Sequence, residues 1–278
     1  MRVGIATIPS ARGAHPGLLG PAVEERGFDR LLVSEHTHTP VEDNPRMPGG
    51  RALDPDHLHC CDPFGWVSYA AAATTRIRLG TGICLVAQHD PLVLAKQVGT
   101  IDHLSGGRFV LGIGYGYNRR EAEDHGIDFG NRRAILREKV LAMRRIWSCD
   151  TAAFDGTHVR FGESWSWPKP DRPQVLMGAA AGPRTFAHVV EFCDGWMMYG
   201  AVSAAQIATL QAAAEAADRD FAELVVGVHR APARYEDLAA LAEMGVDFVT
   251  LTVEPGHIDS ARADLDGLAA LAAKLSSG

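Results

Sequence analysis

The chain has 278 residues, of which 46% are hydrophobic and 22% charged, a composition typical of globular proteins. Its formal net charge of −7 argues against binding to nucleic acids or anionic membranes, since both require a basic surface. The five cysteines are odd in number and scattered, which argues against a secreted disulfide framework. No signal peptide and no membrane-spanning apolar run of ~18 residues is visible, so we expect a cytoplasmic protein.

Short apolar runs alternate with longer helix-like patterns along the chain. The expected strands are 2–8, 30–34, 77–86, 108–114, 174–179, 195–199, 224–229 and 247–253. The expected helices are 17–27, 63–75, 91–104, 131–148, 183–193, 203–219, 235–245 and 258–276. Continuous apolar strands are typical of a parallel sheet that is buried on both faces. Eight βα units in ~250 residues predict an α/β fold, a single (β/α)8 TIM barrel over residues 1–278. The alternative is an open doubly wound sheet, but the first strand lacks a following Gly-rich dinucleotide turn.

Two segments are longer than ordinary loops. They are 36–61, after the second strand, and 150–173, before the fifth. Loops of this length in a compact domain are commonly functional. We therefore expect both near the barrel mouth.

Polar residues and glycines follow several of the expected strands. The second strand ends in Glu35 and His36, and Gly82 and Ile83 lie late in the third. The segments 112–118 and 178–182 end the fourth and fifth strands. Because the active site of a TIM barrel is built at the carboxyl ends of its strands, these segments are expected to converge on one mouth.

The pair His36 and His38 raises the question of a metal site. The segment 54–62 adds further possible ligands. A catalytic metal needs three or four well-placed ligands, and the fifth, sixth and eighth strands end without them. We expect no metal; the remaining interpretation from residue types alone is a pair of solvated loop histidines.

Two glycine patterns admit both a functional and a structural interpretation. Gly112, Gly114 and Gly116 alternate with other residues, but Tyr117 breaks the dinucleotide pattern. Such glycines either let a ligand approach the backbone or permit tight strand ends. In 178–186, small residues precede Pro183, which suits the first turn of a helix whose free amides can bind phosphate. An ordinary β–α turn would have the same sequence.

Taken together, these stretches resemble the luciferase-like monooxygenase superfamily, and within it the branch that uses the deazaflavin coenzyme F420. The resemblance rests on GFDRLLVSEH (27–36), on the long central block 74–129, and on VLMGAAAGPRTFAHVVEFCDGWMMYG (175–200). It covers almost the whole chain.

The resemblance implies roles for particular residues. His36 is the implied active-site histidine beside the reactive face of the ring, and Glu35 is the acidic neighbour that fixes its orientation. Gly82 and Ile83 are implied to form a bulge with a non-prolyl cis peptide bond behind the ring. The remaining implied cofactor-binding residues are Gly114, Gly116 and Asn118 of the fourth strand end, Ala179, Ala180, Ala181 and Gly182 of the phosphate loop, and Arg184 at the phosphate or tail. Trp165 and Trp167 are either part of a lid or a packing patch.

Two features favour F420 over FMN as the cofactor. Tyr115 stands where some FMN-using relatives carry a basic residue, and the chain lacks a long insertion before its last strand. The expected reaction is hydride transfer between F420 and a small organic substrate, with His36 as proton donor or acceptor. One alternative is an FMN-dependent monooxygenase supplied by a separate flavin reductase, and another is a cofactor-binding protein without turnover. The resemblance also implies a homodimer.

Overall fold

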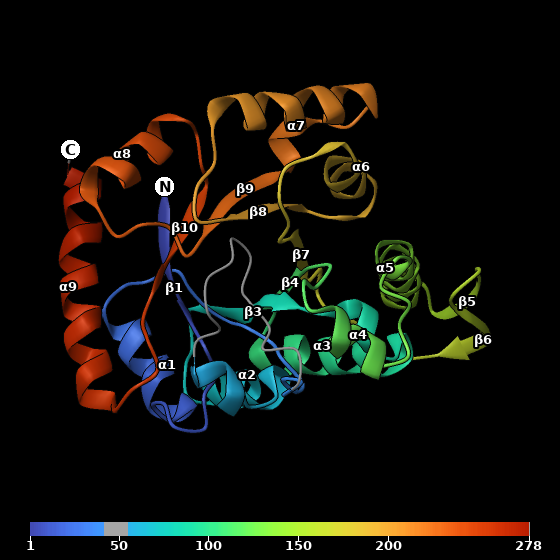
Figure 1. Ribbon diagram of the computed structural model, residues 1–278, viewed down its shortest axis with the longest axis horizontal. Helices are drawn as coiled ribbons and strands as arrows, with labels where there is room; N and C mark the ends of the chain where they lie inside the picture. The colour runs from blue at the N-terminus through green and yellow to red at the C-terminus, as the bar shows by residue number, and fades with distance from the viewer. Residues whose placement is uncertain (42–54, 278) are drawn as a thin grey trace.

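The computed structural model describes residues 1–41 and 55–277, and its centre is a closed barrel of parallel strands surrounded by helices (Figure 1). The barrel strands are β1 (Arg2–Thr7), β2 (Arg30–Val33), β3 (Arg78–Cys84), β4 (Phe109–Ile113), β7 (Gln174–Met177), β8 (Gly195–Tyr199), β9 (Val225–His229) and β10 (Phe248–Thr252). Their order around the barrel is β1-β10-β9-β8-β7-β4-β3-β2. The prediction of an eight-stranded TIM barrel is confirmed.

Helices follow the barrel strands in the expected alternation. They are α1 (Pro16–Glu25), α2 (Pro63–Ala72), α3 (Pro91–Ser105), α5 (Arg132–Ser148), α6 (Pro183–Phe192), α7 (Ala204–Ala216), α8 (Tyr235–Glu243) and α9 (Ile258–Ser277). Short 3-10 turns add η1 (Pro55–His59), η2 (Val86–Gln88) and η3 (Phe221–Glu223). The helix α4 (Arg119–Asp124) lies between β4 and α5 and was not expected. Of the helices in the described part of the chain, none is long and apolar enough to cross a membrane.

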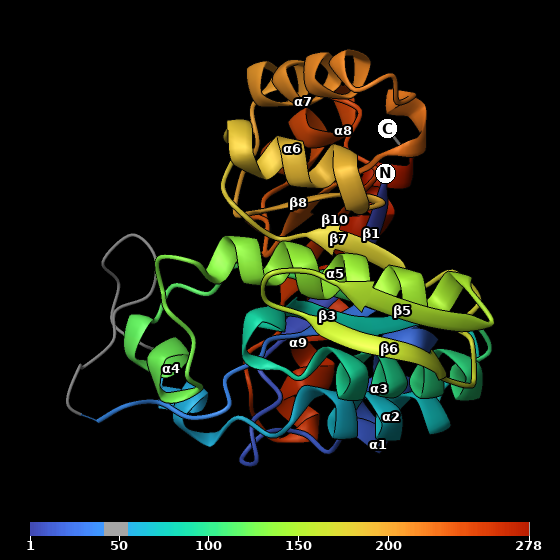
Figure 2. The same cartoon turned by 90° about the vertical axis from the view of Figure 1, so that its right-hand side faces the viewer.

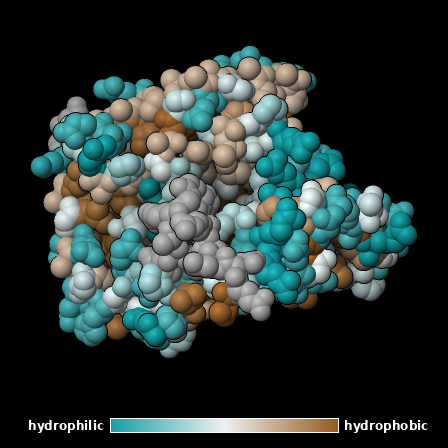
Figure 3. Space-filling view, viewed as in Figure 1, coloured by the Kyte–Doolittle hydropathy of each residue, from teal (hydrophilic) through white to brown (hydrophobic). Residues whose placement is uncertain are grey.

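The outer surface differs in polarity from one helix to the next. In Figure 3 the alanine-rich helix α7, along the top, is weakly apolar, whereas strongly hydrophilic residues cover the side that carries α4 and α5. Only Leu210 and Ala214 of α7 are buried, so alanines make up much of its exposed surface.

Alternate residues of each strand face two separate cores. The larger core lies between the strands and the helices and includes Ile5, Leu31 and Val33. The smaller core lies inside the barrel and consists of Leu32, Val110, Leu176, Met197 and Phe248. Because strand side chains alternate between faces, consecutive residues such as Leu31 and Leu32 belong to different cores.

A buried arginine closes the amino-terminal end of the barrel. The guanidinium of Arg30, the first residue of β2, lies 3.6 Å from the ring centroid of Phe248, and both side chains are 0% exposed. A Cβ at Gly4 would meet Arg30 at 2.3 Å, and one at Gly227 would meet Phe248 at 2.2 Å, so these glycines provide the space. Burial lowers the pKa of Arg30 to about 10, and Asp29 pairs with its guanidinium at 2.6 Å. The barrel interior is therefore filled at this end.

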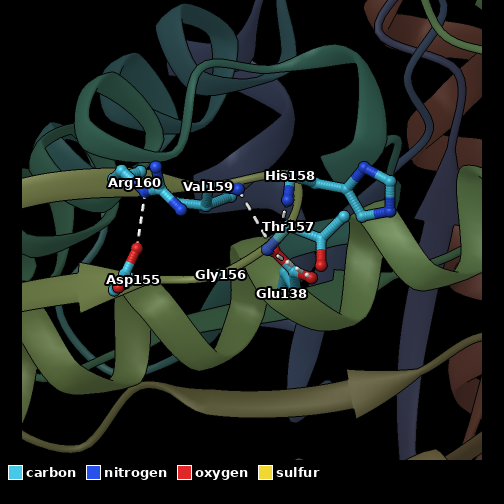
Figure 4. Close-up of a pocket in the computed structure, with 7 residues that line it drawn as sticks. All are labelled: Glu138, Asp155, Gly156, Thr157, His158, Val159 and Arg160. Carbon is cyan, nitrogen blue, oxygen red and sulfur yellow. Dashed lines mark hydrogen bonds and ion pairs between the residues drawn. The ribbon is translucent and has the colours of Figure 1, made fainter.

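The segment 150–173 forms a β-hairpin on the outside of the barrel. Its strands β5 (Thr151–Asp155) and β6 (Arg160–Trp165) pair antiparallel, and the hairpin lies against α5 (Figure 2). At the hairpin tip, the Glu138 carboxylate of α5 accepts hydrogen bonds from the backbone amides of residues 157–159 (Figure 4). These bonds favour the ionised carboxylate more than burial opposes it, so the pKa of Glu138 is lowered.

The expectation that 150–173 lies near the mouth is therefore wrong. The chain beyond β6 continues along α3, where Lys96 donates to the carbonyl of Trp167 and fixes the segment against the outer surface. Trp165 and Trp167 are 77% and 56% exposed there, which excludes a lid role for them in this arrangement. The other long segment is 36–61, of which residues 42–54 lie outside the described part of the chain. Near its end, the backbone of Cys60 pairs with that of Ser10 in an isolated antiparallel β-bridge.

Candidate active site

His36 lies just beyond the carboxyl end of β2, at the mouth of the barrel. Side chains from segments distant in sequence surround it. Its Nδ1 lies 2.9 Å from Oε2 of Glu121 in α4, and its Nε2 lies 3.3 Å from the hydroxyl of Tyr117. The rings of Tyr117 and His57 pack edge-on against the imidazole, with centroids 5.6 and 5.3 Å away. Only 10% of the His36 side chain is exposed. The ends of β2 and β4 and the turn η1 thus enclose one histidine.

Glu121 is a site residue that the sequence analysis missed. Its side chain is 1% exposed, and its Oε1 accepts a hydrogen bond from the backbone N–H of Thr37 at 3.2 Å. Asn118 begins α4 by accepting from the backbone N–H of Glu121 at 3.2 Å. Asn118 was expected to line the cofactor site, but its side chain oxygen is engaged in this cap. An Asn followed three residues later by Glu is the signal that would have predicted the helix start.

The phenol of Tyr117 is held in its neutral form. Burial raises the pKa of Tyr117 to about 12, and the negative charge of Glu121 adds to this effect. Burial likewise raises the pKa of the nearby Cys60 thiol to about 12. Both groups are therefore protonated at neutral pH.

Glu35 does not orient His36, so that implied role is wrong. Consecutive residues of extended chain point to opposite sides, and Glu35 points into the barrel wall. Its Oε1 lies 2.8 Å from Nε2 of His89, and its Oε2 accepts from the backbone N–H of Leu85 at 2.5 Å. Lys139 of α5 donates to the carbonyls of Ala87 and His89 at 2.7 and 2.6 Å. Glu35 and Lys139 together hold the segment 85–89 that follows β3.

Glu35, Cys84 and His89 place three potential metal ligands within 4.8 Å of one another. Glu35 and His89 are hydrogen-bonded to each other, and the second Glu35 oxygen accepts from the backbone N–H of Leu85. Burial raises the pKa of the Cys84 thiol well above its ordinary value. We interpret the group as part of the hydrogen-bonded wall behind β3.

The expected bulge in β3 is present. The peptide bond between Gly82 and Ile83 is cis, and the register of β3 with β4 shifts between Thr81 and Cys84. His229 of β9 fills the space beside Gly82, where a Cβ would lie 2.6 Å from the imidazole. Burial, with the charge of Arg230, lowers the pKa of His229 to about 3, so its ring is neutral at physiological pH.

Two of the strand-end glycines make room for Ile83. A Cβ at Gly114 would lie 2.7 Å from Ile83 Cδ1, and one at Gly178 would lie 2.3 Å from Cγ2. Gly116 has a positive φ of 71°, which few other residues adopt. The immediate role of Gly114 and Gly178 is therefore to leave space for the Ile83 side chain of the bulge. From the sequence pattern alone, these glycines could also have contacted a ligand through their backbone.

The expected phosphate loop connects β7 to α6. Residues Ala179, Ala180, Ala181 and Gly182 lie between them, and the helix begins at Pro183 as predicted. The indole of Trp196 donates to the carbonyl of Ala179 at 2.8 Å. Gly182 supplies no side-chain cap to the first turn, in contrast to Asp90 at the start of α3. Arg184 is exposed in that first turn, so the helix start offers backbone amides next to a cation.

Comparison with known proteins identifies the family. The model of the luciferase-like monooxygenase family matches residues 19–273, so the chain belongs to this family. It is 38% identical over 277 residues to the uncharacterized protein Rv0953c of Mycobacterium tuberculosis, covering 97% of this chain and 98% of that protein. It is 29% identical over 257 residues to an F420-dependent hydroxymycolic acid dehydrogenase of the same organism, covering 87% of this chain and 66% of the other.

Two solved structures share the fold at low sequence identity. The monooxygenase RslO1 from Streptomyces bottropensis has a TM-score of 0.78 at 19% identity, covering 97% of this chain and 98% of that one. An F420-dependent secondary alcohol dehydrogenase, in complex with an F420-acetone adduct, has a TM-score of 0.72 at 16% identity, covering 96% and 98%. These two likenesses show that the fold is shared.

Proposed function

We propose that the protein is an F420-dependent oxidoreductase that transfers hydride between coenzyme F420 and a small organic substrate. The observation that carries the proposal is the partly buried His36, held by Glu121 and Tyr117 at the same end of the barrel as the Gly82–Ile83 bulge. A positioned imidazole is suited to move the proton that accompanies a hydride. F420 dependence in the relatives supports the choice of cofactor.

The residues at the mouth fit such a cofactor by their chemistry. The partly buried Ile83 offers an apolar surface for a flat ring, and the buried His229 beside Gly82 is neutral, so it adds no charge behind that surface. The uncapped first turn of α6 and the exposed Arg184 offer amide donors and a positive charge for a phosphate-bearing chain. The cofactor would supply the hydride-transfer chemistry when bound.

His36 has a defined chemical task in this proposal. Its imidazole accepts a proton from the substrate oxygen during oxidation, or returns it during reduction. Glu121 stabilises the protonated ring through a charge-assisted hydrogen bond of 2.9 Å. Glu35 contributes indirectly, because it fixes the segment after the bulge.

FMN-dependent monooxygenation with a separate flavin reductase is the second candidate, and the monooxygenase RslO1 supports it through its fold. Tyr115 argues for F420, because it takes the position of a basic residue found in some FMN-using relatives. Its hydroxyl bonds Nδ1 of His188 in α6 at 2.8 Å, so Tyr115 lies close to the phosphate loop. A binding protein without turnover is the third candidate, and a homodimer stays a prediction.

The deciding experiment is to purify the protein from a host that makes both F420 and FMN, and to identify the retained cofactor by absorbance and mass. We expect the retained cofactor to be F420. We also expect alcohols to reduce the bound F420, seen as a loss of its absorbance, or ketones and enones to reoxidise the reduced form. Retained FMN with oxygen consumption would support the monooxygenase instead. Retention of F420 without turnover on any donor or acceptor would leave the binding role.

A further inference from the structure

We propose that Glu121 holds the proton of neutral His36 on Nδ1, and that the hydroxyl of Tyr117 carries the proton between the substrate oxygen and Nε2 of His36. In this arrangement Glu121 is a positioning residue and Tyr117 a catalytic residue. The inference rests on the proposed function and adds the path of the proton to it.

The contacts of Glu121 determine which nitrogen of His36 carries the proton. An ionised carboxylate only accepts hydrogen bonds, so Nδ1 of His36 must donate across the 2.9 Å contact. The backbone N–H of Thr37 donates to the other carboxylate oxygen at 3.2 Å and fixes the plane of the carboxylate. Because a neutral imidazole has a single N–H, Nε2 is left as an acceptor.

Tyr117 completes the chain of donors and acceptors. Its phenol is protonated at neutral pH, and its oxygen lies 3.3 Å from Nε2 of His36, so the phenol O–H can donate to this nitrogen. The phenol oxygen keeps lone pairs that can accept a hydrogen bond from a substrate hydroxyl. The edge-on packing of the two rings, with centroids 5.6 Å apart, keeps the hydroxyl next to the imidazole.

The proposed step balances for an alcohol substrate. The substrate O–H bond breaks and its proton passes to the Tyr117 oxygen, while the Tyr117 proton passes to Nε2 of His36. With an oxidised deazaflavin bound, the carbon–hydrogen bond would break and its electron pair would go with the hydrogen, as hydride, to that cofactor. The alcohol would thereby be oxidised to a carbonyl compound and the cofactor would be reduced. The imidazolium that results is paired with the Glu121 carboxylate.

The tautomer can be measured on the full-length chain without cofactor, so this test does not depend on the proposed function. The protein is labelled with ¹⁵N-histidine, and the His36 signals are assigned by their loss in His36→Gln. As the pH is raised until the ring is neutral, we expect the proton on Nδ1 in the wild type and in Glu123→Gln, a control on the same helix. Glu121→Gln should populate both tautomers. A wild-type proton on Nε2, or an unchanged tautomer in Glu121→Gln, would overturn the role of Glu121.

The relay is tested by Tyr117→Phe, which keeps the ring contact and removes only the hydroxyl. We expect kcat to fall about 10²–10³-fold. In H₂O–D₂O mixtures we expect the wild-type rate to vary with the deuterium fraction along a curve, which indicates that two protons move in the step. The Tyr117→Phe rate should vary with the deuterium fraction linearly. Tyr69→Phe is the matched control, because Tyr69 packs edge-on against His15 at 4.8 Å on the barrel exterior. A wild-type kcat, or a curved dependence in Tyr117→Phe, would overturn the relay. Absence of F420 turnover in the wild type would instead contradict the proposed function.

Discussion

Glu121 and His36 are 85 positions apart in sequence, yet the Glu121 carboxylate lies 2.9 Å from Nδ1 of His36. The contact joins the end of β2 to the short helix α4 that follows β4. The neighbouring Glu35 has the partners His89 and Leu85 on the other side of the chain. The two residues of the Glu35–His36 dipeptide thus act in different environments.

Replacement of His36 by Ala should lower turnover about 10²–10⁴-fold, because the acid–base group is lost. Cofactor affinity should fall much less, since the residues of the phosphate loop remain. Steady-state kinetics and cofactor titration measure the two effects separately. His38→Ala is the control: His38 is 40% exposed and pairs with Asp124, so its removal should be mild. Normal turnover in His36→Ala, or loss of activity on chelation, would contradict the assignment.

Gly178→Ala should destabilise the protein by about 1–3 kcal/mol and weaken cofactor binding, because the new Cβ would lie 2.3 Å from Ile83. Urea unfolding gives the stability change. Ile83→Ala in the same chain should recover part of the lost stability, since it removes the clash. Gly162→Ala, in β6, meets open space and should be nearly neutral. If Gly178→Ala behaves like Gly162→Ala, Ile83 is not confined by Gly178.

The barrel was predictable from sequence because its strands are continuous apolar runs separated by amphipathic helices. The hairpin was missed because β6 is mostly exposed and carries no apolar pattern. The helix α4 was missed because it has six residues and no apolar periodicity, apart from the cap at Asn118.

The candidate site was only partly predictable. His36 and the bulge at Gly82 and Ile83 lie at strand ends, where the barrel places functional groups. The alternation of side chains already implies that Glu35 and His36 diverge, and the sequence interpretation did not apply it. The pairing of His36 with Glu121 depends on how β2, β3 and β4 are arranged around the barrel, which no local pattern encodes.

Glu24→Gln should destabilise the protein by roughly 1–2 kcal/mol at pH 7, after allowance for partial exposure. The Glu24 carboxylate accepts backbone hydrogen bonds from Thr75, Arg76 and Ile77. These bonds outweigh the opposing effect of burial and lower its pKa from 4.5 to about 2. The stabilisation is complete above pH 4.5 and is lost as the pH falls towards 2, so the variant and wild type should converge there. Glu25→Gln, an exposed neighbour, should show no such convergence in chemical denaturation at several pH values.

His229 should make stability decline in acid. Its pKa is lowered from 6.5 to about 3, so between these values the unfolded chain binds one more proton than the folded chain. The free energy of unfolding should therefore rise with pH across this window, with a contribution approaching ~1.4 kcal/mol per pH unit. His229→Asn should flatten the dependence, whereas the exposed His103→Asn should not. An identical slope in wild type and His229→Asn would show that other groups dominate.

The stacking of Arg30 on Phe248 limits where a ligand can bind. The pair fills the amino-terminal end of the barrel, and Leu32, Val110, Leu176 and Met197 fill the interior above it. A ligand of this barrel therefore rests on the carboxyl ends of the strands, so it contacts the loops and strand ends and leaves the barrel core intact.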